Sequence, residues 1–74
     1  MLRPMPSPSA PLLVTGATGT VGREVVRAAL AAGHAVRALA PDPADALDRL
    51  ARLPGGATAR ADGRLTAARW DFLA

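Results

Sequence analysis

PLLVTGATGTVGREVV, at residues 11–26, places three glycines where an apolar run gives way to a helical pattern. Residues 11–15 form a short, continuous apolar run, which is typical of a parallel strand buried on both faces. Gly16, Gly19 and Gly22 then follow in steps of three. Glycines at a strand-to-helix junction let the backbone turn tightly, approach a pyrophosphate and bring the helix close to the strand. The stretch therefore predicts an anion-binding turn, in which amide groups at the start of the helix face the phosphates.

Glycine and proline divide the next part of the chain into further elements. The first helix is predicted to run from Thr20 to Gly33, which stands where a helix C-cap belongs. A second strand is predicted at residues 35–40, and a second helix opens at Asp42 and Pro43, with Asp42 as its N-cap. The predicted apolar stripe of the first helix is Val21, Val25, Ala28, Ala29 and Ala32, widened by Val26 and Leu30, and that of the second helix is Leu47, Leu50 and Leu53.

The two ends of the chain carry weaker signals. Residues 1–10, rich in proline and serine, are predicted to form a flexible lead, residues 57–61 a third strand, and residues 63–74 a tail with helical character. Alternating strands and helices with short connections imply parallel pairing and right-handed crossovers. We therefore predict a partial, Rossmann-like three-layer α/β fold over residues 11–62. Its parallel sheet has three strands in the order 3-2-1, and both helices lie on one face.

This arrangement leaves the other face of the sheet and the free edge of its first strand uncovered. Such surfaces favour association, so we expect self-association or a protein partner there. The chain has 74 residues, no cysteine and one histidine, which argues against disulfides, thiol nucleophiles and a structural zinc site. Its net charge of +3 comes from scattered arginines with one tryptophan and one phenylalanine, a pattern that does not favour nucleic-acid binding. No apolar run approaches the roughly 20 residues of a membrane span, and prolines interrupt every candidate secretory signal, so we expect a cytoplasmic protein.

VTGATGTVGREVVRAALAAGHAVRAL, at residues 14–39, closely resembles the start of the atypical and extended short-chain dehydrogenase/reductases, especially their NmrA-like branch. The resemblance covers residues 11–45 well and residues 57–62 loosely, and its glycine spacing is GxxGxxG. It implies a Rossmann fold that binds NAD or NADP. The residues that it places around the pyrophosphate are Gly16, Thr18, Gly19, Thr20, Val21 and Gly22.

Cofactor choice is normally decided at the end of the second strand. Relatives often carry an arginine at the position of Pro41, in a phrase resembling VRALVRDP, whereas this chain has VRALAPDP. Arg37 remains as a candidate for a 2′-phosphate, although strand alternation also suits a surface role, and Asp42 either contacts a ribose or caps the helix. Asp62 follows the predicted third strand, where the resemblance places an aspartate beside the adenine. NADP and NAD both stay open, with NADP slightly favoured.

Catalytically active short-chain reductases commonly use a tyrosine, a lysine four residues later and a nearby serine. This chain has no tyrosine and no lysine, and its two serines, Ser7 and Ser9, lie in the predicted lead. We therefore expect a truncated NAD(P)-binding module without catalysis of its own. Two alternatives remain open, namely the N-terminal piece of an NAD(P)-dependent oxidoreductase and a non-enzymatic redox-sensing or protein-interaction protein.

Overall fold

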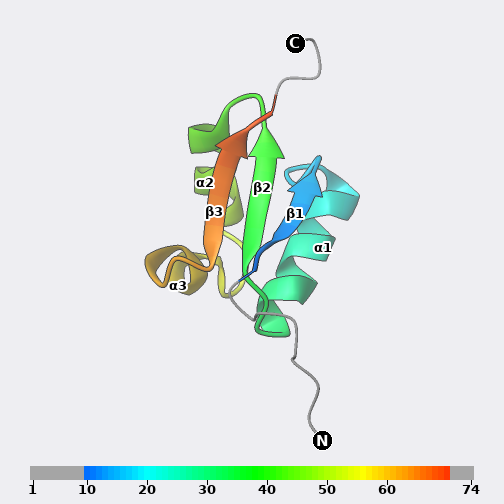
Figure 1. Ribbon diagram of the computed structural model, residues 1–74. Helices are drawn as coiled ribbons and strands as arrows, with labels where there is room; N and C mark the ends of the chain where they lie inside the picture. The colour runs from blue at the N-terminus through cyan, green and yellow to red at the C-terminus, as the bar shows by residue number, and fades with distance from the viewer. Residues whose placement is uncertain (1–9, 71–74) are drawn as a thin grey trace, which may run out of the picture.

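A computed structural model describes residues 10–70 of the chain (Figure 1). Its elements in chain order are β1 (Leu12–Thr15), α1 (Thr20–Ala31), β2 (Val36–Ala40), α2 (Pro43–Leu50), α3 (Gly56–Ala61) and β3 (Leu65–Arg69). The strands pair in parallel in the order β1-β2-β3. The predicted partial Rossmann-like α/β fold and its strand order are thus confirmed, with three helices in place of two. Residues 1–9 of the predicted lead lie outside the described part of the chain.

The hydrophobic core lies between the sheet and the helices, and it contains buried residues of both. Helices α1 and α2 both lie behind the sheet in Figure 1. Parallel strands joined by helical crossovers produce this layering. The largest fully buried side chains are Leu50, Leu65, Val26 and Val36, and burial of each contributes about 1.5–3 kcal/mol. The remaining core is largely alanine, so the chain has a small core and a correspondingly small reserve of stability.

The opposite face of the sheet carries none of the described helices, as predicted, so residues 10–70 form two of the three layers of the predicted fold. Leu13, Arg37 and Thr66 occupy one row across this face, since the strand register pairs Leu13 with Arg37 and Arg37 with Thr66. Thr15, Leu39 and Ala68 form the next row. Leu13 is 63% exposed, which is high for a leucine in a strand. We call this surface, defined by these six residues, the open face.

The structure corrects the predicted third strand and the predicted helical tail. Residues 57–61 lie in α3, and residues 65–69, within the predicted tail, form β3. Gly63, at a φ of +79°, follows the end of α3. The amide of Gly63 donates a hydrogen bond to the carbonyl oxygen of Arg60, and the amide of Arg64 donates one to that of Ala59, which together form a Schellman motif. Residues 71–74 of the tail lie outside the described residues.

The buried side of α1 also differs from the predicted stripe. Val26, Ala29 and Leu30 are its buried residues, whereas Val21 and Val25 are 77% and 46% exposed. The helix has apolar residues on two adjoining sides, and helical periodicity alone does not say which of them meets the sheet. The helix is closed at Gly33 as predicted, although its C-cap is Ala32 and Gly33 is the residue after the C-cap. Gly33 has a φ of +89°, and the amides of Gly33 and His34 donate hydrogen bonds to the carbonyl oxygens of Leu30 and Ala29. No helix within residues 10–70 is long and apolar enough to cross a bilayer.

Candidate functional site

The turn after β1 depends on two of its glycines for its shape. Gly16 has a φ of +62°, a left-handed conformation that favours glycine, and its carbonyl accepts a hydrogen bond from the amide of Gly19 at 3.0 Å. A Cβ at Gly22 would clash with the carbonyl oxygen of Gly16 and lie 2.8 Å from Cα of Ala17. Glycine at 22 therefore lets the first turn of α1 lie directly on the loop that follows β1.

Gly19 differs from these two glycines because its own backbone does not require glycine. It is the N-cap of α1, with φ −76° and ψ 172°, an extended conformation that any residue adopts. A Cβ there would lie 3.3 Å from the carbonyl oxygen of Gly16, a tight contact that would require this backbone atom to shift by a few tenths of an ångström. Serine, aspartate and asparagine are the preferred residues at an N-cap. Glycine at 19 thus leaves the helix start without the side chain that would best complete it.

The amide groups at the start of α1 are consequently open. No side chain caps the helix, and its first turn contains no acidic residue. Within residues 10–70, the amides of Thr20, Val21 and Gly22 have no backbone hydrogen-bond acceptor, and the first helical bond is donated by Arg23 to Gly19. By contrast, the N-terminus of α2 is closed, because Oδ1 of Asp42 accepts a hydrogen bond from the amide of Asp45 at 3.1 Å.

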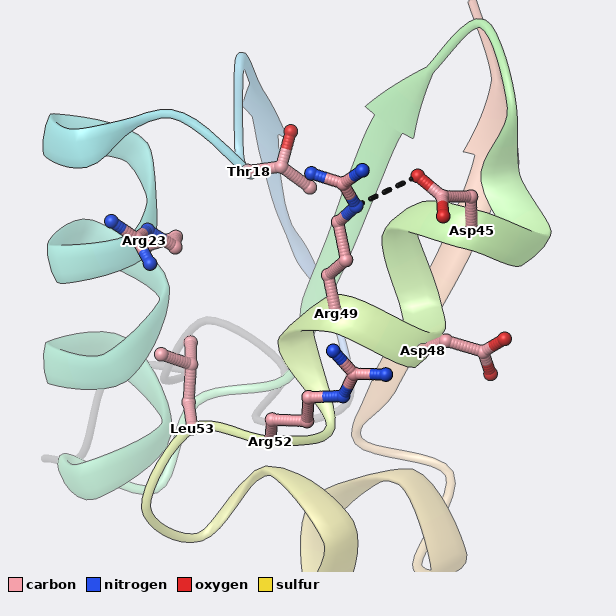
Figure 2. A pocket seen from close by; sticks show the side chains of 7 residues that line it. All are labelled: Thr18, Arg23, Asp45, Asp48, Arg49, Arg52 and Leu53. Atoms are coloured by element: carbon pink, nitrogen blue, oxygen red, sulfur yellow. Dashed lines mark ion pairs between the residues drawn. The ribbon is translucent and has the colours of Figure 1, made fainter.

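A cleft of about 570 Å³ adjoins this turn and separates α1 from α2 (Figure 2). Arg49 extends from α2 toward Thr18 of the glycine turn, and Arg23 extends from α1 on the other wall. The lining residues are Thr18, Arg23, Asp45, Asp48, Arg49, Arg52 and Leu53.

The charges of the cleft leave an excess of cations. Asp45 is paired with Nε of Arg49 at 2.9 Å, and Asp48 is paired with Arg60 of α3 at 2.9 Å. Arg23 and Arg52 form no ion pair with any residue in the described part of the chain. Both carboxylates that line the cleft therefore have a cationic partner, while two guanidinium groups remain available to an anion.

The structure brings most of the sequence-predicted site residues together. The residues that gather in the turn between β1 and α1 are Gly16, Thr18, Gly19, Thr20, Val21 and Gly22. Arg37 lies elsewhere, on the open face of β2 opposite Leu13, and it does not line the cleft. Asp42 caps α2 at the end of β2, as one of its two predicted roles required.

Asp62 does not follow a strand, because the segment before it is α3. It is the C-cap of that helix and precedes β3. Asp62 therefore lies near the amino ends of the parallel strands, whereas the glycine turn lies at their carboxyl ends. Its carboxylate lies 3.8 Å from Nε of Arg64. The premise on which Asp62 was predicted to approach the adenine is therefore wrong.

Comparison with models of known protein families shows the family of this chain. The profile of the NmrA-like family matches residues 8–58, more than half of the sequence, and the match includes the glycine turn and both α1 and α2. The chain belongs to the NmrA-like family. Its members generally bind an NAD(P) dinucleotide. No curated protein gives a significant match to this chain.

The NmrA-like turn of this chain fits the pyrophosphate of such a dinucleotide. Open amides at a helix start attract an anion, and the positive end of the helix dipole adds to that attraction. The exposed main chain of Gly19 gives an anion access without a side chain in the way. Sequence reasoning missed the arginines of the cleft, although Asp45 and Arg49, four residues apart, share one side of α2 and Arg52 follows shortly after its end.

Proposed function

We propose that this NmrA-like chain binds NAD(P), with the pyrophosphate held by the turn between β1 and α1. The observation that carries the proposal is the uncapped start of α1, where the amides of Thr20, Val21 and Gly22 have no acceptor within residues 10–70. An anion would satisfy these donors and interact favourably with the helix dipole. Thr18, half-buried beside them, offers a hydroxyl to the same phosphates.

The three glycines support this role in different ways. Gly16 and Gly22 fix the path of the backbone and the closeness of α1, so their need is explained by the fold. Gly19 has a weaker need, because its backbone is one that any residue adopts and a Cβ would displace the carbonyl of Gly16 by only a few tenths of an ångström. Its lack of a side chain also suits close approach of a phosphate to the main chain. A role in binding thus accounts for the glycine that packing explains least.

We further propose that this chain performs no hydride transfer by itself. A bound nicotinamide dinucleotide supplies hydride chemistry, whereas the protein supplies orientation and proton transfer. The chain has no tyrosine and no lysine to form the usual acid–base pair of short-chain reductases. As an N-terminal piece of an NAD(P)-dependent oxidoreductase, it would contribute this binding turn, and other residues would supply the acid and base.

Titration of Gly19→Val with NAD and NADP tests the binding turn. The valine side chain would stand at the N-cap and block approach to the amides, so we expect binding of both dinucleotides to fall below detection by calorimetry. Ala28→Val is the matched control, because it adds the same side chain at an exposed position of the same helix. Wild-type affinity in Gly19→Val, or an equal loss in both variants, would contradict the proposal.

A second role, in self-association, is favoured by the apolar side chains that β1 and α1 expose. Leu13 on the open face is 63% exposed, and Leu12 at the edge of the sheet is 44% exposed. Val21 and Val25 of the adjoining helix are also exposed. We propose that a second copy of the chain covers Leu13 and the free edge of β1, because edge strands and exposed apolar patches both favour association. A non-enzymatic sensing protein could use such contacts to report the state of its dinucleotide.

A further inference from the structure

The cleft between α1 and α2 has a charge pattern that the pyrophosphate site does not use. Three of its seven lining residues are arginines, and they come from both walls. Its two aspartates are paired, one of them with Arg60 from outside the lining. A cleft with this excess of guanidinium groups attracts an anionic group.

We propose that this cleft binds the 2′-phosphate of NADP, with Arg49, Arg23 and Arg52 as its specificity-determining residues. This inference rests on the proposed function, because it assumes that the pyrophosphate lies on the start of α1. Thr18 belongs to both the glycine turn and the cleft wall, so a nucleotide held at the turn has direct access to the cleft. The 2′-phosphate is the one anionic group that NADP has and NAD lacks.

Arg49 is the best oriented of the three arginines. Asp45 pairs with its Nε atom at 2.9 Å, four residues earlier on the same helix, with the acid on the N-terminal side. Within residues 10–70, its terminal nitrogens Nη1 and Nη2 make no hydrogen bond that would compete with a ligand. A guanidinium held at Nε can offer its two Nη atoms to one phosphate.

Arg23 and Arg52 complete the site with charge rather than with a fixed geometry. Neither has an ion-pair partner in the described part of the chain, so binding of a phosphate would not require either arginine to break an ion pair with a carboxylate there. Arg23 stands on α1, one residue after Gly22, and therefore connects this cleft with the open amides.

The test compares two nucleotides that differ by one phosphate, 5′-AMP and 2′,5′-ADP. Wild-type protein is expected to bind 2′,5′-ADP at least about tenfold more tightly than AMP, as one charge-assisted contact implies. Arg49→Gln and Arg52→Gln should each reduce that ratio severalfold and leave AMP binding within about twofold. Arg37→Gln, which removes the same charge from the open face, is the matched control and should leave the ratio unchanged. NMR signals of the arginine Nε–H groups should shift for Arg49 with 2′,5′-ADP and not with AMP.

Each of the following results would overturn the inference. The first is an unchanged ratio in the Arg49→Gln,Arg52→Gln double variant, and the second is an equal loss in Arg37→Gln. The third is an equal shift of the Arg49 signal with inorganic phosphate at the same concentration, which would indicate general anion binding. Equal affinity for NAD and NADP, both lost in Gly19→Val, would leave the proposed function standing and reject the cleft. If no nucleotide shifts the amides of residues 16–22, both proposals are wrong.

Discussion

Gly19→Asp should raise the stability of this protein and abolish dinucleotide binding. The wild-type residue is an N-cap with extended backbone and no capping side chain, so aspartate can adopt the same conformation. Its carboxylate can accept a hydrogen bond from an amide of the first turn, which is how Asp42 closes α2. The same carboxylate would then occupy the amides that we assign to the pyrophosphate.

The expected gain in stability is small but measurable. Aspartate in place of glycine at an N-cap contributes a few tenths of a kcal/mol, and its charge at the positive end of the helix adds about 0.3–1 kcal/mol. The new Cβ would lie 3.3 Å from the carbonyl oxygen of Gly16, which offsets a part of this gain. A net gain of about 0.5 kcal/mol corresponds to a rise in Tm of roughly 2–4 °C for a chain of this size.

The expected loss of binding is much larger. Two unit charges about 4 Å apart near a protein surface repel each other by about 4 kcal/mol, and every 1.4 kcal/mol corresponds to a factor of ten in affinity. Affinity for NAD and NADP should therefore fall by more than about a hundredfold. Gly19→Ser separates the two effects, because serine can cap the helix without adding a charge and should lose less affinity.

Thermal melting followed by circular dichroism and calorimetric titration together check this prediction. A higher Tm with lost binding in Gly19→Asp is the expected pair of results. Wild-type affinity in Gly19→Asp would refute the assignment of the pyrophosphate to the start of α1. A lower Tm would refute the argument that Gly19 serves a ligand rather than the fold.

Two further predictions concern packing and association. Gly22→Ala should lower the Tm by several degrees in a circular-dichroism melt, because a Cβ there would clash with the backbone of Gly16 and Ala17. The overpacking costs about 1–3 kcal/mol, which exceeds the gain of up to about 1 kcal/mol from alanine in a helix. An unchanged Tm would contradict the close packing of α1. The wild-type protein should self-associate, and Leu13→Glu should convert it to a monomer in size-exclusion chromatography with light scattering. Thr66→Glu, on the far strand of the open face, is the control. A monomeric wild-type protein at tens of micromolar would reject the proposed contact.

The first half of the fold could be predicted because its signals are local. Gly16 and Pro41 mark the ends of two strands, and Asp42 with Pro43 marks a helix start. Gly33 closes α1 through a Schellman motif whose sequence requirement is a single glycine. Each of these features depends on neighbours within a few residues, so it can be predicted from a short stretch of sequence.

The second half could not be predicted from periodicity because alanine dominates both of its elements. ATARA in α3 and LTAAR in β3 lack a clear apolar spacing, and alanine favours helix in isolation. β3 is a strand because it pairs in parallel with β2. Hydrogen bonds just outside its two ends extend this pairing, from the amide of Val36 to the carbonyl of Arg64 at 2.6 Å and from the amide of Trp70 to the carbonyl of Ala40 at 2.9 Å. One local signal was available, since Gly63 follows α3 as Gly33 follows α1.

The candidate site divides in the same way between local and tertiary information. The glycine turn is contiguous, so its residues could be named from the sequence. The cleft is assembled from α1, α2, the loop that follows α2 and the glycine turn. Arginines 23, 49 and 52 line it together only because parallel strands place the two helices on one face of the sheet. Arg37, nearer in sequence to the expected cofactor position, points to the other face because strand residues alternate.

Two helices, α1 and α2, start at the carboxyl ends of the strands, and the difference between their N-termini explains why an anion would bind at α1. Both α1 and α2 follow parallel strands, so their positive ends lie at the same edge of the sheet. The carboxylate of Asp42 already satisfies an amide of α2 and carries a negative charge, so a phosphate is repelled there. At α1 the cap is a glycine and the first turn has no acid. Under the proposed function, a diphosphate would therefore bind at α1, the one helix start at the carboxyl ends of the strands that the described residues leave uncapped, beside the arginines of the cleft.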